Sequence, residues 1–204
     1  YVNKGPFVPI EAQKNLLNYI EKSEDCSYLI ISGSLPQSMD EQYYDELLEI
    51  CNKRNINIIL DISSKKLKDL LKYRPLLIKP NDEEIKEIFG LDINNEKDVV
   101  NILKYLKKEG AQNILLTLGE KGMYFYNGNN IYYCNAPNVN LLSSACSGDS
   151  ALAAFLSEWL KENDIEYALK KSSATGGNVA ESRGIGTLNK VDNYIKNLDV
   201  REVF

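Results

Sequence analysis

Histidine is absent from all 204 residues of this chain. Without it, the chain can hold no Ser-His-Asp or Cys-His catalytic arrangement and no histidine-ligated metal. A general base must therefore be a carboxylate, with Lys, Tyr and Cys as weaker candidates. No Cys-x-x-Cys pair occurs, so a zinc site is not expected, and a chain of this size needs no disulfide framework. The cysteines are Cys26, Cys51, Cys134 and Cys146.

Excess basic charge and long apolar runs are also lacking. The 24 Lys and Arg residues face 29 Asp and Glu residues, a net charge of -5 that argues against nucleic acid or an anionic membrane as partner. No apolar run is long enough to cross a bilayer, and the first residues show no signal-peptide pattern. We therefore expect a cytoplasmic protein. With 44% apolar residues, the chain can form one sizeable core, so we expect a single domain over residues 1–204.

Short apolar runs alternate with amphipathic stretches in the first part of the chain. This rhythm favours a parallel sheet covered by helices on both faces, an α/β fold. Residues 28–31 are expected to form a buried strand. The other expected strands are residues 56–60, 76–78 and 113–117, and the expected helices are residues 40–54, a segment from 65, 82–89 and 96–109.

The rhythm changes after residue 121. Residues 122–126 and 130–134 flank Asn127-Gly128-Asn129, which predicts a hairpin because these residues tolerate positive φ. An antiparallel edge should therefore close the sheet. The remainder is expected to be mainly helical, over residues 148–162, 165–180 and 190–197.

Polar or glycine-rich residues follow the ends of four expected strands. Each such loop alone is more often ordinary turn chemistry than a binding site. In open parallel sheets, however, ligands bind outside the carboxyl ends of the strands. We therefore expect the loops containing Gly33, Asn81, Gly119 and Gly148 to gather along one edge. The four strand-end loops are residues 32–36, 61–64, 79–84 and 117–122.

The segment of residues 143–150, Ser-Ser-Ala-Cys-Ser-Gly-Asp-Ser, leads directly into an expected helix. Free backbone N–H groups at a helix start, aligned with the helix dipole, can bind a phosphate or a developing oxyanion. Asp149 falls in the first turn, where it could act as a base. It could equally be a helix-start residue chosen for capping and for the dipole. Spacing alone leaves both interpretations open.

Residues 147–150 before an Ala-rich helix resemble the second signature of the PfkB carbohydrate kinases, the ribokinase family. The resemblance continues, in the family's order, through residues 32–36, 79–84, 117–122 and 135–137. It implies a ribokinase-like α/β fold whose N-terminal part and lid are absent, so that this chain matches the C-terminal two-thirds of the usual family chain. The Ser-Gly-Ser-Leu-Pro loop is most similar to the branch containing 1-phosphofructokinase and tagatose-6-phosphate kinase.

The resemblance implies an ATP-dependent kinase that uses Mg²⁺. At the matching positions, Asp149 would be the general base that deprotonates the acceptor hydroxyl. The backbone N–H groups around Ser147 and Gly148 would stabilise the transferring phosphoryl group. Asn81 and Glu84 match an Asn-x-x-Glu motif that holds Mg²⁺ largely through water, as this cation prefers.

Further matching positions concern ATP. Thr117, Gly119 and Gly122 match a loop that contacts the ATP phosphates, and Asn178 lies where the family lines its adenine pocket. Cys146 departs from the family, which has glycine there; a left-handed backbone would make a non-glycine residue cost roughly 1–2 kcal/mol. Its thiol could be reactive beside the transferring phosphate, or buried and inert.

The implied reaction transfers the γ-phosphate of ATP to fructose 1-phosphate or tagatose 6-phosphate. One alternative is a kinase for a nonphosphorylated sugar or a nucleoside. Another is a homologue that binds nucleotide or sugar phosphate without efficient turnover, which the Cys146 departure favours. The expected partners are ATP and a sugar phosphate, without nucleic acid or membrane, and a homodimer is left open.

Overall fold

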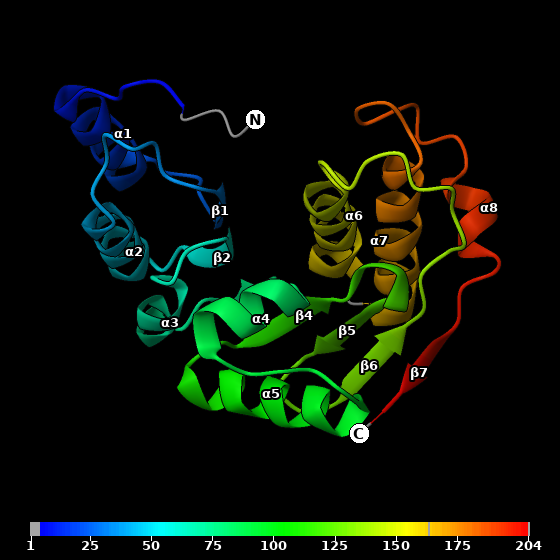
Figure 1. The fold of residues 1–204 in the computed structure, drawn as a ribbon. Coiled ribbons are helices and arrows are strands. Elements are labelled where there is room, and N and C mark those ends of the chain that lie inside the picture. The colour runs from blue at the N-terminus through cyan, green and yellow to red at the C-terminus, as the bar shows by residue number, and fades with distance from the viewer. Residues whose placement is uncertain (1–4, 163, 204) are drawn as a thin grey trace.

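The computed structural model describes residues 5–162 and 164–203. One sheet lies between two sets of helices, and α6 and α7 run side by side against it (Figure 1). The strands are β1 (Tyr28–Gly33), β2 (Asn57–Ile62), β3 (Leu77–Ile78), β4 (Asn113–Thr117), β5 (Met123–Tyr126), β6 (Ile131–Cys134) and β7 (Val200–Glu202). The α-helices are α1 (Ile10–Lys22), α2 (Gln42–Arg54), α3 (Leu67–Leu70), α4 (Asp82–Phe89), α5 (Glu96–Glu109), α6 (Ser147–Glu162), α7 (Ile165–Ala180) and α8 (Val191–Ile195).

The strands are adjacent in chain order, from β1 to β7. β1 to β4 pair in parallel, so each connection must cross over, and helices make these crossovers. β5, β6 and β7 then add in antiparallel fashion. The carboxyl ends of four parallel strands consequently meet at one edge of the sheet.

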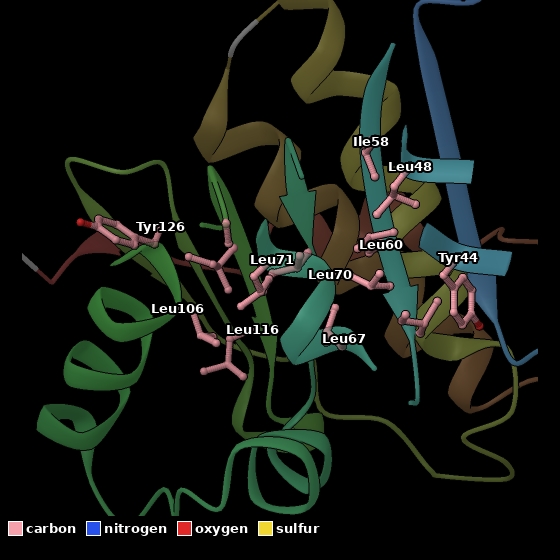
Figure 2. Close-up of a cluster of buried hydrophobic side chains, with 14 of the residues drawn as sticks. Tyr44, Leu48, Ile58, Leu60, Leu67, Leu70, Leu71, Leu106, Leu116 and Tyr126 are labelled. Atoms are coloured by element: carbon pink, nitrogen blue, oxygen red, sulfur yellow. The ribbon is translucent and has the colours of Figure 1, made fainter. Parts of the chain in front are cut away.

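Alternating side chains of each strand belong to two different cores. In β2, Ile58 and Leu60 join the cluster packed against α2, α3 and α5, whereas Ile59 joins the cluster formed with α6 and α7. This follows from the two-residue repeat of a strand. Figure 2 shows the first cluster, in which Tyr44 and Leu48 of α2 face Leu60 of β2. The sheet is therefore covered by helices on both faces, as the apolar runs predicted.

The predicted α/β fold, the hairpin and the antiparallel edge are confirmed. Two elements, α1 and β7, were not predicted from the sequence. The prediction that residues 28–31 form a buried strand is wrong in its burial: Tyr28 and Ile30 are 41% and 51% exposed. β1 is one of the two edge strands in the described part of the chain, and β7 is the other. Ile59 of the neighbouring strand β2 packs in the cluster with α6 and α7, whereas Tyr28 and Ile30 of β1 stay exposed. Among the described residues, no helix combines the length and apolar character needed to span a membrane.

Candidate active site

The four strand-end loops meet at the carboxyl edge of the sheet. Ser32 is in register with Asp61, and Asn81 forms a bridge with Thr117, whose N–H donates to the Pro80 carbonyl at 3.1 Å. The amino end of α6 joins the same edge, because the Ser32 hydroxyl donates to Asp149 Oδ1 at 3.2 Å. The predicted gathering of these loops is therefore confirmed.

Contacts with α7 and the preceding turn hold the amino end of α6. The Ser147 hydroxyl donates to the Gly176 carbonyl of α7 at 2.8 Å, and the Ser147 N–H donates to the Ser144 carbonyl. A side chain at Gly176 would meet Ala151 and Ser147 at 3.3–3.4 Å, so glycine allows the close approach of the two helices. The first amides of a helix have no acceptor within it. Because the Ser147 N–H is already bonded, Gly148 and Asp149 are the residues whose amides are suited to an anion.

Asp149 is exposed in the first turn of α6, and one oxygen of its carboxylate accepts a hydrogen bond from the Ser32 hydroxyl. A carboxylate at this position is favoured by the helix dipole. Its exposure leaves it accessible to a ligand at the carboxyl edge. The geometry therefore permits the role of base.

Cys146 immediately precedes α6 and has a φ of 63°, in the left-handed region. It is exposed, so of the two alternatives the buried thiol is wrong. A left-handed backbone strains a non-glycine residue by roughly 1–2 kcal/mol, and Cys146 meets this condition. The thiol lies one residue from Ser147 and can be reached by solutes at this edge.

We expect iodoacetamide to label the exposed Cys146 faster than the buried Cys51 and Cys134. Burial raises the pKa of Cys51 to about 11 and that of Cys134 to about 12, so both carry little reactive thiolate. These two residues are internal controls in a peptide mass map of the labelled protein. ATP with Mg²⁺ should slow labelling of Cys146 alone. An unlabelled Cys146 in nucleotide-free protein would contradict this prediction.

Asn81 and Glu84 form a capping box at the start of α4. The Asn81 side chain accepts from the Glu84 N–H at 2.8 Å, and the Glu84 carboxylate accepts from the Asn81 N–H at 3.0 Å. Glu84 also accepts the Ser63 hydroxyl. The pair thus has a structural role. Its amide and carboxylate oxygens are also of the type that Mg²⁺ prefers, so the residues fit a hydrated Mg²⁺.

The loop from Thr117 to Gly122 forms a short 3₁₀ turn, Gly119–Lys121, between β4 and β5. Gly119 has a φ of 58° with open space around it, whereas Gly122 has a φ of 88° and lies against the end of β6. The Leu118 N–H donates to the Gly122 carbonyl at 2.9 Å, which closes the loop. Thr117 and Gly119 thus lie at the carboxyl edge, and Gly122 packs the loop against the end of β6.

Asn178 has a structural role that was not predicted from the sequence. It is 2% exposed in α7, and its side-chain oxygen accepts from the Lys190 N–H at 2.9 Å. Its amide group donates to the Ser182 hydroxyl at 3.3 Å. These contacts fix the segment between α7 and α8. The Asn178 side chain is largely occupied by these contacts, and its contact with adenine stays a prediction.

Asp61 and Lys79 form an ion pair that was not predicted from the sequence. Lys79 Nζ lies 2.9 Å from Asp61 Oδ1, and the two side chains are only 6% and 9% exposed. Burial raises the pKa of Asp61, Lys79 opposes this shift, and the charges of Asp149 and Glu84 add to it. The sequence signal for this pair was Asp61 near the end of one apolar strand and Lys79 directly after the next strand.

Comparisons with known proteins agree with this architecture. The chain is similar to phosphofructokinase-2 from Escherichia coli in complex with potassium, with a TM-score of 0.86 and 23% identity over 97% of this chain and 65% of that one. This likeness shows a ribokinase-like fold. The pfkB family carbohydrate kinase pattern matches residues 10–191, and the chain belongs to this family.

Two curated relatives refine the comparison. A D-tagatose-1-phosphate kinase from Klebsiella oxytoca is 41% identical over 98% of this chain and 66% of its own length. A 1-phosphofructokinase from Bacillus subtilis is 29% identical over 90% of this chain and 61% of its own length. The chain therefore spans less than two-thirds of the length of these relatives.

Proposed function

We propose that this protein is part or all of an ATP-dependent carbohydrate kinase that transfers the γ-phosphate to a hydroxyl of a ketohexose monophosphate. The observation that carries the proposal is the exposed Asp149 carboxylate at the start of α6, where free amides of the first turn and the strand-end loops converge. Membership of the pfkB family supports the reaction class.

Each part of this edge has a defined task in the proposed reaction. Asp149 takes the proton of the acceptor hydroxyl as the hydroxyl oxygen attacks the γ-phosphorus. The amides of Gly148 and Asp149 stabilise the charge of the transferring phosphoryl group. Thr117 and Gly119 contact the ATP phosphates. Positioning and electrostatics supply most of the rate in such a transfer.

Mg²⁺ would be held by Asn81 and Glu84, largely through water, and would neutralise the phosphate charge. Glu84→Gln separates this role from the capping box, since Gln at this position can still accept from the Asn81 N–H. We expect the Mg²⁺ concentration for half-maximal rate to rise roughly 10-fold or more, as for other groups that bind a metal through water. The thermal midpoint should stay the same.

Glu84→Ala is the comparison for this experiment, because it removes the carboxylate and with it the half of the capping box that accepts from the Asn81 N–H. The Asn81 side chain still accepts from the N–H of residue 84, so stability should fall only by about 1 kcal/mol, the net contribution of one hydrogen bond, in addition to the change in Mg²⁺ dependence. If Glu84→Gln left the Mg²⁺ dependence unchanged, Asn81 and Glu84 would serve only to start α4.

The relatives' names support an acceptor that already carries a phosphate. Both named relatives act on a ketohexose 1-phosphate, which favours fructose 1-phosphate or tagatose 1-phosphate over tagatose 6-phosphate. Initial rates of ADP formation with each of these three acceptors, with fructose and with adenosine would test this choice. A phosphorus NMR spectrum of the product would identify the bisphosphate. Turnover of fructose or adenosine alone would overturn the proposed substrate class.

A binding protein with little turnover is the second candidate, and the strained backbone of Cys146 favours it. Cys146→Gly distinguishes the two. If the side chain only crowds the amides, glycine should preserve or raise kcat. A protein that binds ATP but remains inactive with every acceptor, even with glycine there, would support the second candidate.

A further inference from the structure

A continuous row of polar side chains leads from Asp149 into the interior. The Ser32 hydroxyl lies 3.2 Å from Asp149 Oδ1 and 3.4 Å from Asp61 Oδ2. Asp61 Oδ1 in turn lies 2.9 Å from Lys79 Nζ. The row joins the ends of β1 and β2, the residue after β3, and the start of α6. It therefore links the carboxyl ends of three of the four parallel strands, β1, β2 and β3, to the start of α6.

Burial differs sharply along the row. Lys79 and Asp61 are 6% and 9% exposed, whereas Ser32 and Asp149 are exposed. A buried ion pair is costly to break, because one partner would be left as an uncompensated charge. The inner pair is therefore the fixed end of the row, and Asp149 is the end that meets ligands.

The ammonium group also lies against α6. A side-chain carbon added to Gly148 would be 3.3 Å from Lys79 Nζ. The charge of Lys79 is thus placed beside the positive end of the α6 dipole, which is normally unfavourable, and Asp61 offsets it. Lys79 Nζ therefore lies close to Gly148, the residue that precedes Asp149.

An aspartate in the first turn of a helix has a competing local option. Its carboxylate can turn back and accept from the free amides of its own helix, as capping side chains do. Those are the amides that the proposed reaction needs for the phosphoryl group. The Ser32 hydroxyl holds the carboxylate toward β1 instead. Ser32 has a single hydroxyl hydrogen, which it shares between Asp149 Oδ1 and Asp61 Oδ2, so the direction in which the hydroxyl points depends on where Asp61 is held.

We propose that Lys79, Asp61 and Ser32 are positioning residues that hold the Asp149 carboxylate away from the amides of α6 and toward the acceptor hydroxyl. The proposal rests on the proposed kinase function. Lys79 fixes Asp61, Asp61 fixes the hydroxyl of Ser32, and Ser32 fixes one oxygen of Asp149. The second carboxylate oxygen is left for the acceptor.

The mildest test is Ser32→Ala, which removes one exposed hydroxyl. We expect kcat to fall roughly 10–100-fold, as for other small misplacements of a reacting group, with the KM for ATP unchanged. Ser27→Ala, just before the opposite end of β1, is the matched control and should leave both constants unchanged. A kcat for Ser32→Ala within about twofold of wild type would overturn the proposal.

Removal of the inner pair needs a variant that does not strand a charge. The double substitution Asp61→Asn with Lys79→Met removes both charges together, and Asp92→Asn with Lys86→Met does the same to an exposed pair. If the inner pair acts through Ser32, its loss and Ser32→Ala should lower kcat by less together than the product of their separate effects. If the effects of the two changes on kcat multiplied fully, the inner pair would not act through Ser32 and would have only a structural role.

The ¹³C signal of the Asp149 carboxyl group gives a readout that does not require turnover. Asp149→Asn assigns the signal. We expect Ser32→Ala and the inner-pair variant to shift it in the same direction, and the exposed-pair variant to leave it in place. If the protein had no kinase activity but showed these shifts, the proposed function would be refuted. The proposal that Lys79, Asp61 and Ser32 position Asp149 would still hold. A signal that does not move would refute the row.

Discussion

Asp149→Asn is expected to lower kcat by roughly 10²–10⁴-fold, the range that general-base catalysis supplies. Asparagine has nearly the same shape as aspartate, and its side-chain oxygen can still accept the Ser32 hydroxyl that now reaches Asp149 Oδ1. An amide cannot take the proton of the acceptor hydroxyl. Steady-state rates would show the loss, and titration with ATP in the presence of Mg²⁺ should show nearly unchanged nucleotide binding.

The rival interpretation of Asp149 is that it serves only the start of α6. Asp164 provides a matched control, because it is an exposed aspartate at the start of α7 whose side chain accepts from the Tyr167 N–H at 3.0 Å. Asp164→Asn keeps a good capping residue and should leave kcat unchanged. If Asp149→Asn retained more than about a tenth of the wild-type kcat, Asp149 would not be the base.

The convergence of the strand-end loops could be predicted from the sequence because it needs only the strand direction. Parallel strands place all their carboxyl ends at one edge, so the loops that carry Asn81 and Thr117 had to lie at the same edge. Their direct bridge depends in addition on the pairing of β3 with β4. The hairpin around Gly128 could also be predicted, because it depends only on the residues of its own turn. Burial of β1 could not be predicted, since it depends on which elements cover the neighbouring strand and not on its own apolar residues.

The pairing of Lys79 with Asp61 lay beyond the sequence for a different reason. It depends on the register of β3 beside β2, in which the Lys79 N–H donates to the Leu60 carbonyl at 3.0 Å. A shift of one residue would turn the Lys79 side chain to the other face of the sheet. The capping box of Asn81 and Glu84 was readable from its spacing, but the same spacing also matched a metal motif, and only the contacts showed the cap.

Gly122→Ala is expected to destabilise the protein by about 3 kcal/mol or more. Gly122 has a φ of 88° and a ψ of -150°, a region that side-chain-bearing residues rarely adopt. A carbon added there would lie 2.2 Å from the Cys134 carbonyl oxygen and 3.0 Å from Asn135 Cα. These are backbone atoms at the end of β6, so relief of the clash requires separation of β5 from β6. Thermal or urea unfolding of the purified variant measures the loss.

Gly119→Ala separates backbone strain from the clash within the same loop. Gly119 also has a positive φ, 58°, but no atom lies within 4 Å of the added carbon. It should cost only about 1 kcal/mol, the strain of a left-handed alanine. For a domain of this size, about 1 kcal/mol lowers the thermal midpoint by roughly 2–4 °C, so the two variants should differ by several degrees. Equal midpoints would mean that β6 can move away from Gly122. The contact between Gly122 and the end of β6 would then not fix the loop that carries Thr117.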